Sequence, residues 1–390
     1  MKKPQTTDVP NQGQPGPTES SAFIPWNSIA ESVVDRPPKQ LSWSDAKESP
    51  CLSCATSPCC THLPLTTFKV TNAVELDHAI YLLNFDHIEL GLSANGDWSA
   101  FYRYPCRFLD REKFLCTVHN LPEQPQICVS YDPFRCWYRR NLTGSISENY
   151  LRIDRPRMQF IVDRVLFDES RNIIEVPDWD TMTEGFAELV PETPAAPPEP
   201  STAPPLRAEW QRIVLSPDEI EVEPTARSYS SLKDPCSECS AYCCTTLVFP
   251  QPQPASAANL DYLRFALGFP GVSLGITETE WELVVNTTCR HLENGRCSVY
   301  GQPERPLLCR YYDAWKCFYR PHFGKARPEE YLRIGLEEFE ALTECFLFDD
   351  HGMVVAAASL EETREHIESR WRRDAEAPAA QPALAVDSEG

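Results

Sequence analysis

Apolar residues recur at helical spacing in two similar segments of the chain. Residues 74–85 read VELDHAIYLLNF and follow Asn72, with Glu75 at the position that completes a helix-capping box. Residues 258–269 read ANLDYLRFALGF and repeat the apolar spacing. We therefore predict one amphipathic helix in each segment.

Shorter apolar runs predict strands and hairpins. The stretch EWELVVNTTC at 280–289 is typical of a strand that ends at a cysteine. Two stretches, VLFDESRNIIEV at 165–176 and FLFDDHGMVVAA at 346–357, place polar turns between apolar arms and predict β-hairpins. The residues SLEETREHIESRW at 359–371 predict a closing helix. The chain thus combines helices and strands with many loops that contain proline or glycine, which indicates an α+β fold.

The two halves of the chain carry the same residues in the same order. An offset of 181 residues aligns Cys116 with Cys297 and holds without a gap as far as Phe167 and Phe348. Further upstream the offset grows, which indicates small insertions between elements. A repeat of this length describes a folded unit that is present twice.

Proline-rich and polar segments set the expected boundaries. We predict a disordered N-terminal segment at 1–47, a first cysteine-cluster domain at 48–190, a Pro/Ala/Glu-rich linker at 191–208, a second cysteine-cluster domain at 209–372 and a disordered tail at 373–390. Within the first segment, Phe23, Ile24 and Trp26 could dock locally. The expected architecture is two tandem, small, loop-rich domains that metal organises, because a metal supplies cross-links that a small core lacks.

Composition limits the cellular compartment and the classes of partner that the sequence is compatible with. The formal net charge of −21 at pH 7 argues against nucleic acid as the main partner, because phosphate binding needs a basic surface. The first residues lack the apolar stretch of a secretory signal, and no apolar run is long enough to cross a bilayer. We therefore expect a cytoplasmic protein that does not bind membranes.

Sixteen of the seventeen cysteines fall into two sets of eight that repeat in the same order. The sets are Cys51, Cys54, Cys59, Cys60, Cys106, Cys116, Cys128 and Cys136, and then Cys236, Cys239, Cys243, Cys244, Cys289, Cys297, Cys309 and Cys317. In a reducing cytosol disulfides are rare, and clustered cysteines more often bind metal or carry out redox chemistry. Metal ligation is thus favoured over a disulfide framework for all sixteen.

The spacing within each set suits chelation. The first two cysteines of a set are separated by two residues, so both sulfurs can reach one metal centre. The two adjacent cysteines that follow point apart in an extended chain, so they could serve different centres, or one of them could be buried. Eight thiols would hold two four-sulfur centres, or one centre with four thiols to spare.

The metal is expected to be iron in an iron–sulfur cluster, or zinc. Thiolates suit both metals in softness. Histidine is not available to both halves, because His119 aligns with Tyr300 and His291 aligns with Phe108. Structural zinc sites commonly use two CxxC pairs, whereas each set has one, and its longer gaps are more typical of cluster ligands on loops. These spacings favour the iron–sulfur cluster and leave zinc open.

The second set resembles a known family. The stretches CSECSAYCC at 236–244 and CRHLENGRCSVYGQPERPLLCRYY at 289–312 are similar to the YkgJ-type cysteine-cluster family, also described as the CxxCxxCC zinc- or iron-chelating domain. The resemblance extends to the first half, which keeps its eight cysteines but has Gln124 in place of Arg305 and His119 in place of Tyr300. It implies chelation of zinc or iron and names no reaction.

Residues outside the two sets of cysteines carry weaker signals. Tyr131 and Tyr312 are aligned next to the eighth cysteine, and their hydroxyls could donate hydrogen bonds to thiolate sulfur; a purely structural role is the alternative. Asp168 and Asp349 are expected to shape hairpin turns. Cys345 belongs to neither set and is expected to be a buried small hydrophobic residue.

The predicted function is metal binding, through clustered cysteine thiolates that chelate iron or zinc, with the reaction unknown. One alternative is a protein lysine N-methyltransferase that uses S-adenosylmethionine, because flagellin lysine methylases look similar in carrying a related cysteine cluster. The chain lacks the glycine-rich GxGxxG turn that would support this alternative. The other alternative is an interaction scaffold with structural zinc and a protein partner.

Overall fold

The computed structural model describes helices and strands in both halves of the chain and confirms the α+β class. The described residues are 24–25, 54, 57–119, 121–129, 131, 133–142, 144, 146–192, 239, 241–312, 316–323 and 330–376. We call residues 57–192 the first half and residues 239–376 the second half. Cys51, Cys236 and most of the predicted terminal and linker segments lie outside the described residues, so the domain boundaries stay a prediction.

The first half is built on an antiparallel sheet of five strands in the order β2-β4-β3-β8-β7. The strands are β2 (His62–Phe68), β3 (Ile88–Ser93), β4 (Trp98–Arg103), β7 (Ile146–Ser147) and β8 (Tyr150–Ile153). Helix α3 (Ala73–Leu82) follows β2, and the Asn72 side chain accepts hydrogen bonds from the N–H groups of Val74 and Glu75. The predicted cap at Asn72 is confirmed, and the Glu75 carboxylate accepts the N–H of Thr71.

Short elements fill the rest of the first half. They are η2 (Pro58–Cys60), β5 (Leu109–Asp110), β6 (Leu115–Cys116), α4 (Gln126–Val129), η3 (Pro133–Arg135), α5 (Trp137–Leu142), α6 (Arg155–Val162), β9 (Leu166–Phe167), β10 (Ile173–Glu175) and α7 (Trp179–Glu188). All the cysteines of the first set that lie in named elements are carried by these short elements and not by the sheet.

The second half repeats this topology with a sheet of four strands in the order β11-β13-β12-β16. Its elements are η6 (Tyr242–Cys244), β11 (Thr246–Gln251), α8 (Ala257–Leu267), β12 (Val272–Ile276), β13 (Trp281–Asn286), β14 (Leu292–Glu293), β15 (Arg296–Cys297), α9 (Leu307–Arg310), α10 (Tyr319–Phe323), β16 (Leu332–Ile334), α11 (Phe339–Thr343), β17 (Phe346–Phe348), β18 (Val354–Ala357) and α12 (Leu360–Glu376). The predicted helix over 258–269 and strand over 280–289 are confirmed as α8 and β13.

Both predicted hairpins and the closing helix are present as β9–β10, β17–β18 and α12. The Asp168 carboxylate accepts the N–H of Asn172, and the Asp349 carboxylate accepts that of Met353, which confirms their role in the turns. The short strand β1 (Ile24–Pro25) pairs with β17 of the second half, whereas the sequence suggested only local docking of Ile24.

Two strands that the sequence did not predict follow the adjacent cysteines directly. These strands, β2 and β11, contain Pro64 and Pro250, which weaken a strand prediction because proline cannot donate to a sheet ladder. Both strands lie at the edge of their sheets, where one side of the backbone needs no partner strand. Edge position therefore explains why the prolines are tolerated.

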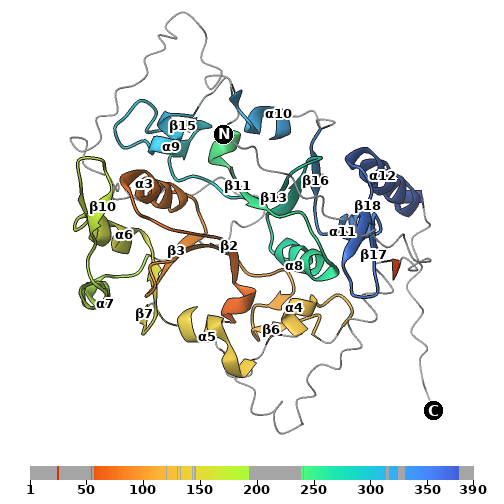
Figure 1. Ribbon diagram of the computed structural model, residues 1–390, viewed down its shortest axis with the longest axis horizontal. Coiled ribbons are helices and arrows are strands. Elements are labelled where there is room, and N and C mark those ends of the chain that lie inside the picture. Colours follow the sequence, from red (N-terminus) through yellow and green to blue (C-terminus); the bar gives the residue numbers. More distant parts are fainter. Residues whose placement is uncertain are drawn as a thin grey trace, which may run out of the picture.

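The two halves share one hydrophobic core. A single cluster of buried side chains includes Leu63 and Phe85 of the first half and Phe269 and Leu283 of the second. We call α3 and α8 the first helix of the first and second half. Helix α3 lies beside α9, and helix α8 lies beside α4, so each first helix packs on the opposite half (Figure 1). Duplicated surfaces thus bury one another, as in an isologous dimer formed within one chain.

No helix in the described part of the chain is long and apolar enough to cross a membrane.

Candidate metal centre

The adjacent cysteines of each set form a tight turn with the same geometry in both halves. Each turn is a 3-10 helix, and it follows a residue in the left-handed region, Ser57 with φ 38° and Ala241 with φ 56°. Such φ values are uncommon for residues other than glycine. Their recurrence shows that the turn is held by its surroundings in both halves.

A backbone hydrogen bond joins this turn to the fifth cysteine. The Cys106 N–H donates to the Cys60 carbonyl at 2.7 Å, and the Cys289 N–H donates to the Cys244 carbonyl at 2.7 Å. Because the bond is direct and short in both halves, the fourth and fifth cysteines of each set are fixed side by side.

The sixth and seventh cysteines come from a small hairpin and a short helix. In the hairpin β5–β6 Cys116 pairs with Leu109, and in β14–β15 Cys297 pairs with Leu292. The seventh cysteines lie on α4 and α9. Five cysteines of each set are thereby gathered, and we call them the first and second thiol groups. They are Cys59, Cys60, Cys106, Cys116 and Cys128, and then Cys243, Cys244, Cys289, Cys297 and Cys309.

Within the first thiol group the side chains interact electrostatically. The sulfurs of Cys59 and Cys60 lie 3.9 Å apart and share a hydrogen bond, which lowers the pKa of Cys59 and raises that of Cys60. Desolvation is the main cause that raises the pKa of Cys106, Cys116 and Cys128, and the charge of Cys59 adds to it in each case. A negative charge on one thiol is thus felt by the other four.

The second thiol group repeats this pattern with one added cation. The hydrogen bond with Cys244 is the main cause that lowers the pKa of Cys243 to about 7, and the guanidinium of Arg305 contributes. Burial raises the pKa of Cys289 to about 11 and that of Cys309 to about 12. Arg305 also opposes the rise at Cys309, so it lies within range of several thiols of the group.

The gathered thiol side chains do not converge on a single point where a metal ion would bind. Among the described residues, no group of three or more His, Cys, Asp or Glu side chains is arranged to hold a metal ion. The fifteen described cysteines are all free thiols. Cys54 and Cys239 are described, whereas their CxxC partners Cys51 and Cys236 are not, so the predicted chelating pairs stay a prediction.

The eighth cysteine of each set is hydrogen-bonded to a tyrosine. The Tyr312 hydroxyl donates to the Cys317 sulfur at 3.6 Å, and Tyr131 makes the equivalent hydrogen bond to Cys136. Each hydroxyl also accepts a backbone N–H, from Phe318 and from Trp137. The expected tyrosine–sulfur contacts are confirmed in both halves. Cys345 lies apart from both thiol groups on the chain segment after α11, half-buried, with its thiol donating to the Ala341 carbonyl.

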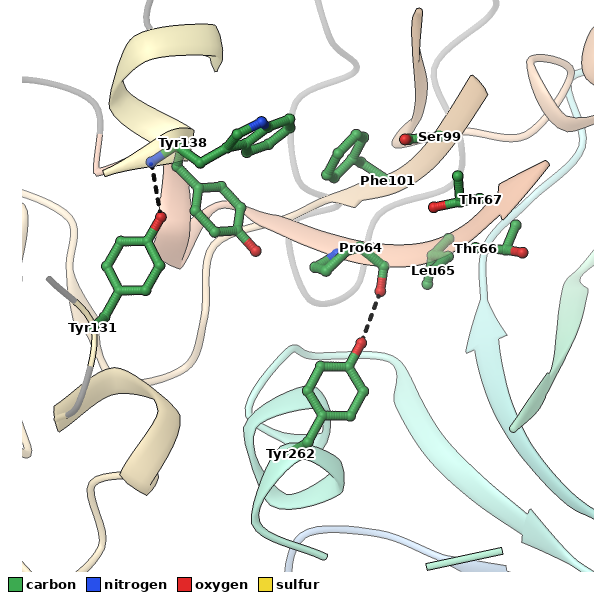
Figure 2. A pocket seen from close by; sticks show the side chains of 10 residues that line it. Pro64, Leu65, Thr66, Thr67, Ser99, Phe101, Tyr131, Tyr138 and Tyr262 are labelled. Carbon is green, nitrogen blue, oxygen red and sulfur yellow. Dashed lines mark hydrogen bonds between the residues drawn. The ribbon is translucent and has the colours of Figure 1, made fainter. Parts of the chain in front are cut away.

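A pocket with a volume of about 480 Å³ lies against strand β2, between helices α5 and α8 (Figure 2). It is lined by Pro64, Leu65, Thr66, Thr67, Ser99, Phe101, Tyr131, Trp137, Tyr138 and Tyr262. Tyr262 enters from helix α8 of the second half, and its hydroxyl donates to the Pro64 carbonyl at 3.3 Å. The half-buried Tyr138, in the pocket wall, lies within electrostatic range of Cys59 and Cys128.

Sequence reasoning did not single out the side chains that the opposite half contributes to each thiol group. Asp77 and Asp261 are aligned and buried in the two first helices, and their carboxylates contact the short helices α9 and α4. The signal that could have found them is a carboxylate on the apolar face of each helix, because a buried charge needs a partner.

No protein-family model, no curated protein and no solved structure matches this chain. The resemblance to the YkgJ-type cysteine-cluster family therefore stays a prediction, and so does what it implies.

Proposed function

We propose that each half of the chain binds iron or zinc through cysteine thiolates, with an iron–sulfur cluster favoured over zinc. The observation that carries this proposal is that the same backbone hydrogen bond joins the fourth and fifth cysteines in both halves, and that each of the five cysteines lies within electrostatic range of other members of its thiol group. A structural thiol of a small core has no reason to gather with four others, since free cysteines can pack singly.

The chemistry of the donor groups fits a soft cation. Most of these thiols have a raised pKa because they are desolvated and repel one another's charge. A bound metal would replace the protons and offset that repulsion, so that binding energy also stabilises the fold. The CxxC pair of each set would complete the ligands, and closure around an ion would require rotation of the thiol side chains. An iron–sulfur cluster would supply one-electron chemistry, and zinc would supply cross-linking.

Elemental analysis of anaerobically purified protein, together with its visible spectrum, tests the proposal. We expect iron with matching sulfide and a brown colour, or colourless protein that holds zinc. Serine at both Cys236 and Cys239 should lower the metal bound by the second half, whereas Cys345→Ser, the matched control, should retain all of it. Total metal that is unchanged in the double variant would reject the assignment.

The two other functions are separated by simple measurements. Equilibrium binding of labelled S-adenosylmethionine, lost on addition of a competing analogue, would favour the methyltransferase. Stoichiometric zinc whose removal by a chelator unfolds the chain, without any bound small molecule, would favour the interaction scaffold.

A further inference from the structure

Each first helix caps the short helix that carries the seventh cysteine of the opposite half. The Leu307 N–H at the start of α9 donates to the Asp77 carboxylate on α3 at 2.7 Å. In the corresponding contact of the other half, the Ile127 N–H of α4 donates to the Asp261 carboxylate on α8 at 3.1 Å. Both carboxylates are buried. The contact is therefore made twice, in opposite directions along the chain.

The short helix α9 depends on this contact. Its N-cap residue, Pro306, provides no side-chain hydrogen bond to the first turn. A helix of four residues is too short to be stable alone, because nucleation fixes several dihedral angles for one hydrogen bond. The carboxylate of Asp77 supplies the missing cap from another part of the fold.

A second reciprocal pair of bonds lies next to the fifth cysteines. The Arg290 N–H donates to the Asn84 carbonyl at 2.8 Å, and the Arg107 N–H donates to the Gly268 carbonyl at 2.8 Å. Arg290 follows Cys289 directly and Arg107 follows Cys106, so both acceptors lie at the end of the opposite half's first helix. The fifth and seventh cysteines of each thiol group are thus both held from the opposite half.

Residues of each first helix also lie close to cysteines of the opposite half. Buried Tyr81 of α3 lies within electrostatic range of Cys243, Cys289 and Cys309. A methyl group added at Gly268, at the end of α8, would lie 3.3 Å from the Cys106 sulfur. Each thiol group therefore lies at the contact between the halves.

We propose that the first helix of each half shields the thiol group of the opposite half from solvent, an arrangement that we call closure. As a consequence, the two metal centres bind their ions as a coupled pair. The coupling rests on the proposed metal binding, whereas the closure does not. An ion that orders the second thiol group fixes α9 against α3, which belongs to the first half. By linkage, an ordered first half then favours ions at both sites, and the effect is reciprocal.

Thiol labelling of the full-length, metal-free chain tests the closure, with labelled cysteines assigned by peptide mass spectrometry. We expect Asp77→Ala to speed labelling of Cys309 about five-fold, the change that loss of one helix cap produces, with little effect on Cys128. Asp261→Ala should do the opposite. Asp77→Asn keeps an acceptor oxygen and should therefore restore slow labelling. This variant also tests the contact if the alanine variant fails to fold.

The matched control is Asp178→Ala, because Asp178 caps helix α7 of the first half through the Thr181 N–H and contacts neither thiol group. It should leave the labelling ratio of Cys309 to Cys128 unchanged. Closure is overturned if Asp77→Ala exposes Cys128 more than Cys309, or both equally.

Native mass spectrometry during metal titration tests the coupling. At half saturation, wild-type protein should be mostly empty or fully loaded, and the Asp77→Ala/Asp261→Ala variant should show the random distribution of partly loaded chains. A random distribution in the wild type overturns the coupling. If the wild type binds no metal, the proposed function fails, and the labelling experiment still decides the closure.

Discussion

The guanidinium of Arg305 lies over the ring of Tyr300, with 4.3 Å between its central carbon and the ring centroid. In the first half the aligned residues Gln124 and His119 also contact each other, with 3.4 Å between the amide nitrogen and Nδ1. The two differences between the halves are therefore one coupled change. It places a cation–π pair beside the second thiol group and a pair without a guanidinium beside the first.

Replacement of the cation should weaken the second centre selectively. We expect Arg305→Gln to speed loss of metal from the second half several-fold, because the positive charge offsets that of Cys243, Cys297 and Cys309. Competition with a chelator measures the change. Arg372→Gln, on the exposed face of α12, is the control. Equal loss from both halves would contradict the prediction.

Two aligned glycines allow close packing of two aligned tyrosines in the sheets. A methyl group at Gly91 would overlap Tyr150, and one at Gly275 would overlap Tyr331. We expect Gly275→Ala to lower the free energy of unfolding by about 2 kcal/mol, since overpacking forces side chains from their rotamers. Denaturant titration measures it. Gly144→Ala, where the nearest atom is 3.6 Å away, should be nearly neutral; a similar loss there would argue against the overlap.

Gly268 should affect a cysteine of the opposite half. Its added methyl group would meet the Phe265 carbonyl at 3.0 Å and the Cys106 sulfur at 3.3 Å. We expect Gly268→Ala to change the labelling rate of Cys106 by more than that of Cys289, although Gly268 belongs to the second half. Labelling of the metal-free chain measures both rates, and a larger change at Cys289 would contradict the prediction.

A buried ion pair makes the stability of the first half depend on acid pH. Arg152 donates to both Glu89 oxygens, at 2.6 and 2.5 Å. Burial alone would raise the pKa of Glu89, but the hydrogen bond and charge of Arg152 outweigh it, so the net pKa is lowered. Stability from Glu89 is therefore present above about pH 4.5, its ordinary value, and is lost as the pH falls through the lowered pKa.

Glu89→Gln should remove this dependence and leave Arg152 without its counter-charge. We expect a loss of about 3 kcal/mol at pH 7, because breaking a buried pair strands one charge, and a smaller difference from wild type at pH 3. Denaturant titrations at both pH values measure it. In the second half the aligned pair is Ser273 and Arg333, 2.8 Å apart, so Ser273→Ala should show no such acid dependence. Parallel pH profiles for Glu89→Gln and wild type would contradict the assignment.

Local signals predicted the elements that local interactions form. The Asn72 cap, the polar hairpin turns at Asp168 and Asp349, and the apolar spacing of α8 all act within a few residues, and the structure has each of them. The edge strands β2 and β11 were missed because their prolines carry a local penalty that only edge position removes.

The candidate site was predictable in its residue types and not in its construction. The repeat identified two sets of eight cysteines, of which the structure gathers five in each half. It gave no sign that Asp77 contacts Leu307, because these residues are 230 positions apart and no periodicity relates them. The tyrosines behind the eighth cysteines were found only because both halves carry them.

The amino-acid sequence by itself determined the duplicated unit, its α+β elements and the thiol-rich chemistry of each half. Capping, periodicity and repeated spacing are all short-range properties of the chain. Only the tertiary structure decided that the halves share one core and that each first helix reaches the thiol group of the other. The physical reason is that buried surfaces and buried carboxylates find partners by complementarity in space, which sequence separation does not encode.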